Sequence, residues 1–204
     1  MRFIYTLDPD IVDLLKSEGF KRKGNVFLRI HGDGILQCVF LTRGSVAKDC
    51  SYSISLRSIY EPDVFGDVSV YRGALTYPYE LNDFNIEKSG YHSNYELMKH
   101  ACISKLNDAN SQESFCKLIF LLDTTRFGYV RWYMEMLVIP SLVALGKFEL
   151  SNQKCDMVLS HNDGLAGVLQ MKELLATGNS ELIHSFLTQV KSNNLRQYMS
   201  LKFK

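Results

Sequence analysis

The sequence predicts an α+β fold with an N-terminal helix, an antiparallel sheet of three to five strands and then a helical C-terminal half. Runs of apolar residues with strand-type alternation lie within residues 1–92, where Gly and Pro separate them. Helical spacing of apolar residues dominates residues 93–204. No low-complexity stretch or long linker divides the chain, so we expect residues 1–204 to form a single α+β domain.

The composition is that of an ordinary globular protein. Of the 204 residues, 46% are hydrophobic, 22% charged and 12% aromatic, and disordered chains are poorer in aromatic residues. A formal net charge of +1 gives no general attraction to nucleic acid or to an anionic membrane. The longest apolar run, Met136 to Leu145, is far shorter than the about 20 residues that span a bilayer. We therefore expect neither a membrane nor nucleic acid as the partner.

The cysteines and the N-terminus predict a reducing compartment. The five cysteines are an odd number, and no two lie closer than twelve residues, which fits neither a disulfide framework nor a zinc-ligand pattern. The apolar stretch at the N-terminus is too short for a signal peptide. We therefore expect a cytoplasmic protein.

The first 41 residues predict a helix followed by a β-hairpin. Asp8 is a suitable cap for the helix, Pro9 suits its first position and Gly19 its end. The turn Gly32-Asp33-Gly34 between two apolar runs predicts the hairpin. Alternation along both strands predicts one shared apolar face formed by Val26, Leu28, Ile30, Ile35, Val39 and Leu41.

A third strand is expected near residues 52–60. Apolar and polar side chains alternate there, as Tyr52, Ile54 and Leu56 against Ser53, Ser55 and Arg57. This alternation predicts that one face of the sheet is open to solvent. An open face beside a basic turn can seat a partner, so Ser53, Ser55 and Arg57 are one candidate binding surface. A plain solvent-exposed face is the alternative, and it is the more common case.

The second half of the chain predicts helices. Ser93 and Glu96 form a capping box that opens a helix to about residue 106. Helical spacing predicts further helices over residues 110–122, 129–145, 163–177 and 180–190, of which the last two form a helical hairpin. Pro140 is expected to kink the third of these helices or to start a new one.

A group of arginine and aromatic residues is the other candidate binding surface. It contains Arg126, Tyr129, Arg131, Trp132 and Tyr133 within eight residues. Arginine and aromatic residues are enriched at interface hot spots, and they also suit stacking on nucleic-acid bases. From this group we take Arg126, Arg131, Trp132 and Tyr133 as candidate binding residues. In the more common alternative, the aromatic side chains anchor a buried helix and the arginines lie at its rim.

No local motif for catalysis, metal binding or a cofactor occurs. The sequence has no His-Glu-x-x-His, Cys-x-x-Cys, Walker, Gly-x-Gly-x-x-Gly or Gly-x-Ser-x-Gly pattern. We therefore expect no metal and no cofactor. One alternative is a small hydrolase or transferase with a site assembled from Cys50, His31, His92, Glu61 and Asp63. Another is weak nucleic-acid binding through the basic C-terminus and Lys21–Lys23, Arg29 and Arg43.

The segment that joins the first helix to the hairpin carries one family resemblance. Residues 14–29, and most specifically Gly19-Phe20-Lys21-Arg22-Lys23-Gly24, resemble the opening of a bacterial family catalogued as domain of unknown function 4304. Members begin with a helix, then Gly-Phe, a basic turn with Gly and a strand. The resemblance implies an α+β fold and a bacterial origin. It implies no chemistry, because the family has no established activity.

These observations favour a non-catalytic binding or protein-interaction module of a regulatory or toxin-protective type. The expected partner is another protein. The hydrolase or transferase and the weak nucleic-acid binder remain the alternatives, and nothing in the sequence predicts an oligomeric state.

Overall fold

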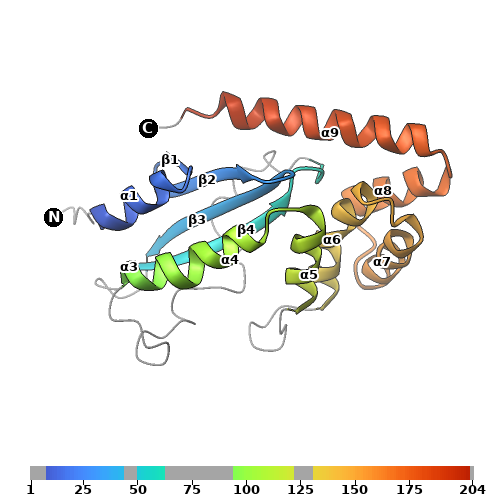
Figure 1. Ribbon diagram of the computed structural model, residues 1–204. Coiled ribbons are helices and arrows are strands. Elements are labelled where there is room, and N and C mark those ends of the chain that lie inside the picture. The colour runs from blue at the N-terminus through green and yellow to red at the C-terminus, as the bar shows by residue number, and fades with distance from the viewer. Residues whose placement is uncertain (1–7, 44–49, 63–93, 122–130, 203–204) are drawn as a thin grey trace.

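A computed structural model describes residues 8–43, 50–62, 94–121 and 131–202 (Figure 1). The N-terminal part contains α1 (Pro9–Ser17), β1 (Lys21–Lys23), β2 (Val26–His31), β3 (Ile35–Arg43) and β4 (Cys50–Ser58). The helical part contains α3 (Asn94–Glu96), the π-helix η3 (Leu97–Ile103), α4 (Ser104–Asp108), α5 (Gln112–Leu121), α6 (Arg131–Ala144), α7 (Phe148–His161), α8 (Ala166–Ala176) and α9 (Ser180–Ser200). The predicted α+β fold, with a helix, an antiparallel sheet and a helical C-terminal half, is confirmed.

The sheet has four antiparallel strands in the order β1-β2-β3-β4. In the predicted hairpin, His31 pairs with Ile35 across a three-residue turn in which Gly32 and Gly34 have φ values of 54° and 101°. Paired residues point to the same face. The predicted composition of the faces is therefore wrong, and the residues that share a face are Val26, Leu28, Ile30, Leu36, Cys38 and Phe40.

Lys21 to Lys23, which correspond to the basic turn of the family resemblance, form the edge strand β1. They pair with Leu28, Phe27 and Val26 of β2. Lys21 lies over the ring of Tyr198, with Nζ 5.4 Å from the ring centre.

Helices cover both faces of the sheet (Figure 1). On one face, α1 and the continuous helix α3–η3–α4 share a core with Phe27, Val39 and Ile54. On the other face, α9 packs through Tyr198 on Leu28, Leu36 and Cys38. The predicted open face is therefore wrong: Ser55 lies opposite Cys38 on the side that α9 covers, and it is only 1% exposed.

The remaining helices form a second core beside the sheet. Helices α6, α7 and α8 pack in sequence, and their buried side chains meet Ile183 and Leu187 from the first half of α9. Pro140 lies inside α6, which continues through it as one helix, so no new helix starts there. Helix α7 was not predicted. None of the described helices is both long and apolar enough to cross a membrane.

Helix α9 connects the two cores. Its first turn is capped by Asn179, whose side chain accepts hydrogen bonds from the backbone N–H groups of Glu181 and Leu182 at 3.0 and 3.1 Å. Its buried residues recur every three or four positions and are Ile183, Leu187, Val190, Asn194 and Tyr198. The first two belong to the helical core and Tyr198 to the sheet. The polar Asn194 lies between them.

Candidate binding site

The predicted arginine–aromatic group does not form a described surface. Arg126 lies outside the described residues, and Arg131 and Tyr133 lie in α6 with side chains outside the description. Trp132 is half-buried and packs against the helical core. It therefore takes the alternative role of a core anchor.

The second predicted surface is not available either. Ser55 is buried, and the side chain of Ser53 lies outside the description. Arg57 forms a charge-assisted contact with Glu61, four residues on, and both side chains are largely buried, at 12% and 16% exposed. A partly buried guanidinium needs such a counter-charge, so the pair explains why Arg57 can lie on a covered face.

The residues of the hydrolase alternative are not brought together within the described parts of the chain. His92 and Asp63 lie outside those parts, as does the side chain of Cys50. His31 is half-buried, and burial, with a smaller effect from Arg29, lowers its pKa. Glu61 is held by Arg57. Among the described residues, no three His, Cys, Asp or Glu side chains cluster as metal ligands would.

The described cysteines are small hydrophobic core residues. Burial raises the pKa of Cys38 and Cys102 to about 12, and that of Cys116 and Cys155 to about 11. All four are buried and free. Their thiols are therefore protonated at neutral pH, whereas a nucleophilic cysteine acts as its thiolate.

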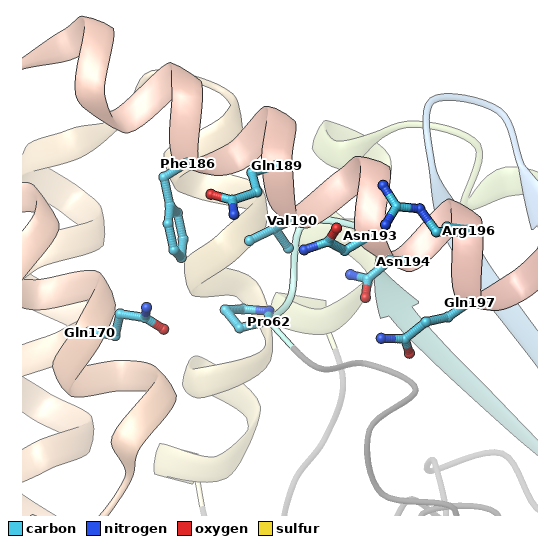
Figure 2. A pocket seen from close by; sticks show the side chains of 9 residues that line it. All are labelled: Pro62, Gln170, Phe186, Gln189, Val190, Asn193, Asn194, Arg196 and Gln197. Atoms are coloured by element: carbon cyan, nitrogen blue, oxygen red, sulfur yellow. The ribbon is translucent and has the colours of Figure 1, made fainter.

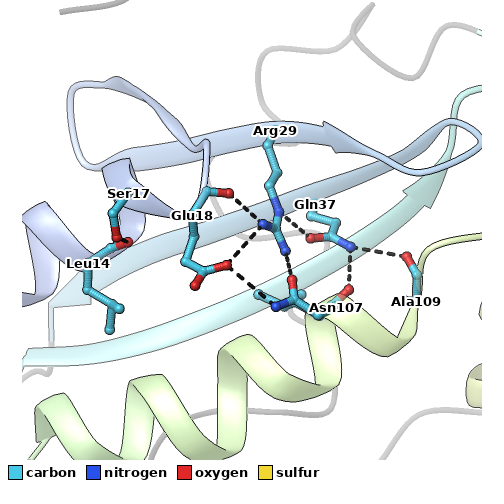
Figure 3. Close-up of polar contacts among 8 residues, drawn as sticks. Leu14, Ser17, Glu18, Arg29, Gln37, Asn107 and Ala109 are labelled. Carbon is cyan, nitrogen blue, oxygen red and sulfur yellow. Dashed lines mark hydrogen bonds and ion pairs between the residues drawn. The ribbon is translucent and has the colours of Figure 1, made fainter.

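Arg29, one of the predicted nucleic-acid contacts, lies inside a buried polar network (Figure 3). Its Nε donates to Gln37 at 2.7 Å and its Nη1 to the carbonyl oxygen of Glu18 at 2.5 Å, while Asn107 accepts from Nη2. The guanidinium also lies 4.4 Å from the ring centre of Phe20. Burial lowers the pKa of Arg29, and the charge of Glu18 opposes this effect.

Gln37 continues the network to the helical layer below the sheet. Its Nε2 donates to the carbonyl oxygens of Leu106 at 2.5 Å and Ala109 at 3.1 Å. The network thus joins α1, β2, β3 and the end of α4, and each contact satisfies a group that would be costly to bury alone. Its role is structural, and Arg29 is not accessible to a phosphate.

An open surface cavity lies along α9. It has a volume of about 430 Å³ and lies between α9, α8 and the chain after β4 (Figure 2). We call it the amide cleft, because five of its nine lining residues carry a carboxamide. The lining residues are Pro62, Gln170, Phe186, Gln189, Val190, Asn193, Asn194, Arg196 and Gln197.

One of these amides, Asn194, has a structural role in the cleft. Asn194 is buried, and its Nδ2 donates to the carbonyl oxygens of Ile59 at 2.7 Å and Glu61 at 2.9 Å. These two bonds fix the middle of α9 to the chain that leaves β4. Pro62 therefore reaches the floor of the cleft, opposite Gln170 of α8.

The other four amides have unused hydrogen-bonding capacity. Within the described parts of the chain, the side chains of Gln170, Gln189, Asn193 and Gln197 make no hydrogen bond, and Arg196 has neither a hydrogen bond nor an ion pair. Each carboxamide offers one acceptor oxygen and two donor hydrogens. The five groups therefore suit a polar ligand held by many hydrogen bonds.

The polar lining of the cleft consists of carboxamides and one guanidinium. Among the described residues that line the cleft, none can act as a nucleophile or exchange a proton near neutral pH, since carboxamides do not titrate and arginine stays protonated. A sequence signal for the cleft exists: four Asn or Gln residues occur between 189 and 197, and no acidic residue follows Glu181.

No protein-family model, no curated protein and no solved structure matches this chain. The resemblance to domain of unknown function 4304 thus stays a prediction.

Proposed function

We propose that this protein is a non-catalytic protein-interaction module that holds its partner in the amide cleft. The observation that carries the proposal is a set of four carboxamides and one guanidinium, gathered from α8 and α9, whose hydrogen-bonding groups are unused within the described chain. These side chains are accessible to solvent, so a partner with matching donors and acceptors can replace their hydrogen bonds to water with direct ones.

The helix that carries most of these groups is firmly held. Tyr198 donates to a backbone carbonyl oxygen of β2, and Asn194 donates to one in the chain just after β4. Ile183 and Leu187 attach the same helix to the helical core. A rigid support limits the entropy that is lost when a ligand orders exposed side chains. The backbone positions that carry the α9 amides are therefore fixed before a ligand binds.

We further place this module in the bacterial cytoplasm, in a regulatory or toxin-protective role. The four described cysteines are free and buried, which suits a reducing compartment. The bacterial origin rests on the resemblance of residues 14–29, and the protective role suits a module that binds a protein without chemistry.

The test is comparative capture of proteins from a lysate of the source organism. The immobilised full chain is compared with a Gln189→Ala/Asn193→Ala/Gln197→Ala variant and with a Thr188→Ala/Ser192→Ala control. The control changes exposed residues of the same helix that do not line the cleft. We expect a protein that is retained by the wild type and by the control and lost with the triple variant. Equal retention by all three proteins, or capture of no protein, contradicts the proposal.

A further inference from the structure

The amides of the cleft follow α9 at a regular interval. Gln189, Asn193 and Gln197 are four residues apart, and Figure 2 shows them one after another along the helix. With a rise of about 1.5 Å per residue, their attachment points lie about 6 Å apart along the axis. An extended polypeptide advances about 6.7 Å in two residues. The interval of the amides thus nearly matches every second peptide group of an extended chain.

The hydrogen-bonding pattern matches as well. A peptide group has one N–H donor and one C=O acceptor, and a carboxamide can satisfy both at once. Three amides over eight residues span about 12 Å, which corresponds to about four residues of an extended chain. The flexible side chains of glutamine and asparagine can absorb the small mismatch in interval.

The positive charge of Arg196 favours extended polypeptides that carry an acidic side chain. Arg196 lies between Asn193 and Gln197 in sequence, is exposed, and has no ion pair within the described residues. Its planar guanidinium can bind a carboxylate through two parallel hydrogen bonds. No acidic residue follows Glu181, so this wall of the cleft carries no carboxylate that would repel an acidic ligand.

A polynucleotide fits these observations less well. It would bring one phosphate for every nucleotide, whereas Arg196 is the only charged side chain among the described lining residues. Binding of nucleic acid draws most of its affinity from several phosphate contacts.

We propose that the amide cleft binds an extended polypeptide segment with an acidic side chain, with its backbone on Gln189, Asn193 and Gln197 and its carboxylate on Arg196. This rests on the proposed function and names the part of the partner that enters the cleft. Because three of the four contacts are with the backbone, a short peptide with one suitably placed Glu or Asp binds weakly whatever its other residues. Selection of one protein in the cell depends on further contacts outside the cleft.

The test is a titration of the ¹⁵N-labelled full chain with three pools of acetylated and amidated hexapeptides at millimolar total concentration. The first pool has Glu at its fourth position and random residues elsewhere. The second has Gln in place of the Glu, and the third is the Glu pool with every peptide nitrogen methylated. The readout is the side-chain NH₂ signals of Gln189, Asn193 and Gln197.

We expect a saturable shift of these three signals with the Glu pool, about threefold weaker binding of the Gln pool, and no shift with the methylated pool. The Arg196→Gln variant should bind the Glu and Gln pools equally, and Thr188→Ala/Ser192→Ala should behave as the wild type. No shift with the Glu pool, or an equal shift with the methylated pool, overturns the inference. If the lysate partner is nevertheless lost from the triple variant, the proposed function stands and only the extended-peptide ligand is rejected.

Discussion

Asn193 and Asn194 carry the same side chain at adjacent positions of α9 and have opposite roles. Asn194 is 1% exposed and bonds to two backbone carbonyl oxygens, whereas Asn193 is exposed and makes no side-chain hydrogen bond with the described residues. Adjacent helical residues point about 100° apart, so Asn194 points at the chain that leaves β4, whereas Asn193 points into the open part of the cleft. Asn194 thus stabilises the fold, whereas Asn193 is available to bind a ligand.

Replacing Asn194 with alanine should destabilise the protein by about 1–3 kcal/mol, because the carbonyl groups of Ile59 and Glu61 lose their bonds to a buried side chain. Urea denaturation measures the change in the free energy of unfolding. The matched control Asn193→Ala should change it by less than about 0.5 kcal/mol. Equal effects of the two substitutions would show that Asn194 does not clamp α9.

The thiols give a second prediction at this scale. Burial raises the pKa of Cys38 and Cys102 to about 12 and of Cys116 and Cys155 to about 11, so at pH 8 the native protein should hold these four as unreactive thiols. Ellman's reagent should react rapidly with at most one of the five cysteines in the native state, and with all five in guanidinium chloride. Rapid reaction of two or more native thiols would contradict the burial of these residues.

The sequence did not predict the burial of two polar side chains, Arg29 and Ser55. Ser55 was predicted to face solvent because it alternates with apolar residues, and Arg29 was a contact of the nucleic-acid alternative, yet both are buried. Arg29 is satisfied by Glu18, Gln37 and Asn107, and the last of these is 78 residues away in sequence. A network with such long-range members depends on tertiary packing, which the local pattern around Arg29 does not contain.

Elements with strong local signals were predictable. Asp8 and Pro9 mark the start of α1, and the glycine-rich turn marks the β2–β3 hairpin, as predicted. The pairing of faces failed because it depends on loop length: three loop residues place His31 and Ile35 on one face. Helix α7 escaped prediction because its buried residues, Ser151, Cys155 and Val158, are small and only weakly apolar as a group.

Helix α9 is the element on which both the sheet and the cleft depend. Tyr198 covers Leu28, Leu36 and Cys38 of the sheet and is 7% exposed. Tyr198→Ala should therefore lower the free energy of unfolding by about 3 kcal/mol, because it opens a cavity over the sheet. Urea denaturation tests this against Met199→Ala, a change at a position that is 72% exposed and should cost less than about 0.5 kcal/mol. A small effect of Tyr198→Ala would mean that α9 is not firmly packed on the sheet.

At the scale of the whole molecule, the amide cleft lies where the helical core meets the sheet. Ile183 and Leu187 of α9 belong to the helical core, and Tyr198 packs on the sheet. Between them, Asn194 donates a hydrogen bond to the backbone of Ile59. Pro62 and Gln170 line the same cleft although they lie far apart in the sequence. The spacing of the α9 amides is visible in the sequence, but the opposite wall of the cleft is set by tertiary structure.

The most direct measurement is photo-crosslinking from single positions of α9 in cells of the source organism. A benzophenone amino acid replaces either Asn193, which lines the cleft, or Ser192, its exposed neighbour outside the cleft. The account predicts a discrete adduct with one protein from position 193 and little or none from position 192. Equal crosslinking from both positions, or no protein adduct from position 193, would contradict binding in the amide cleft.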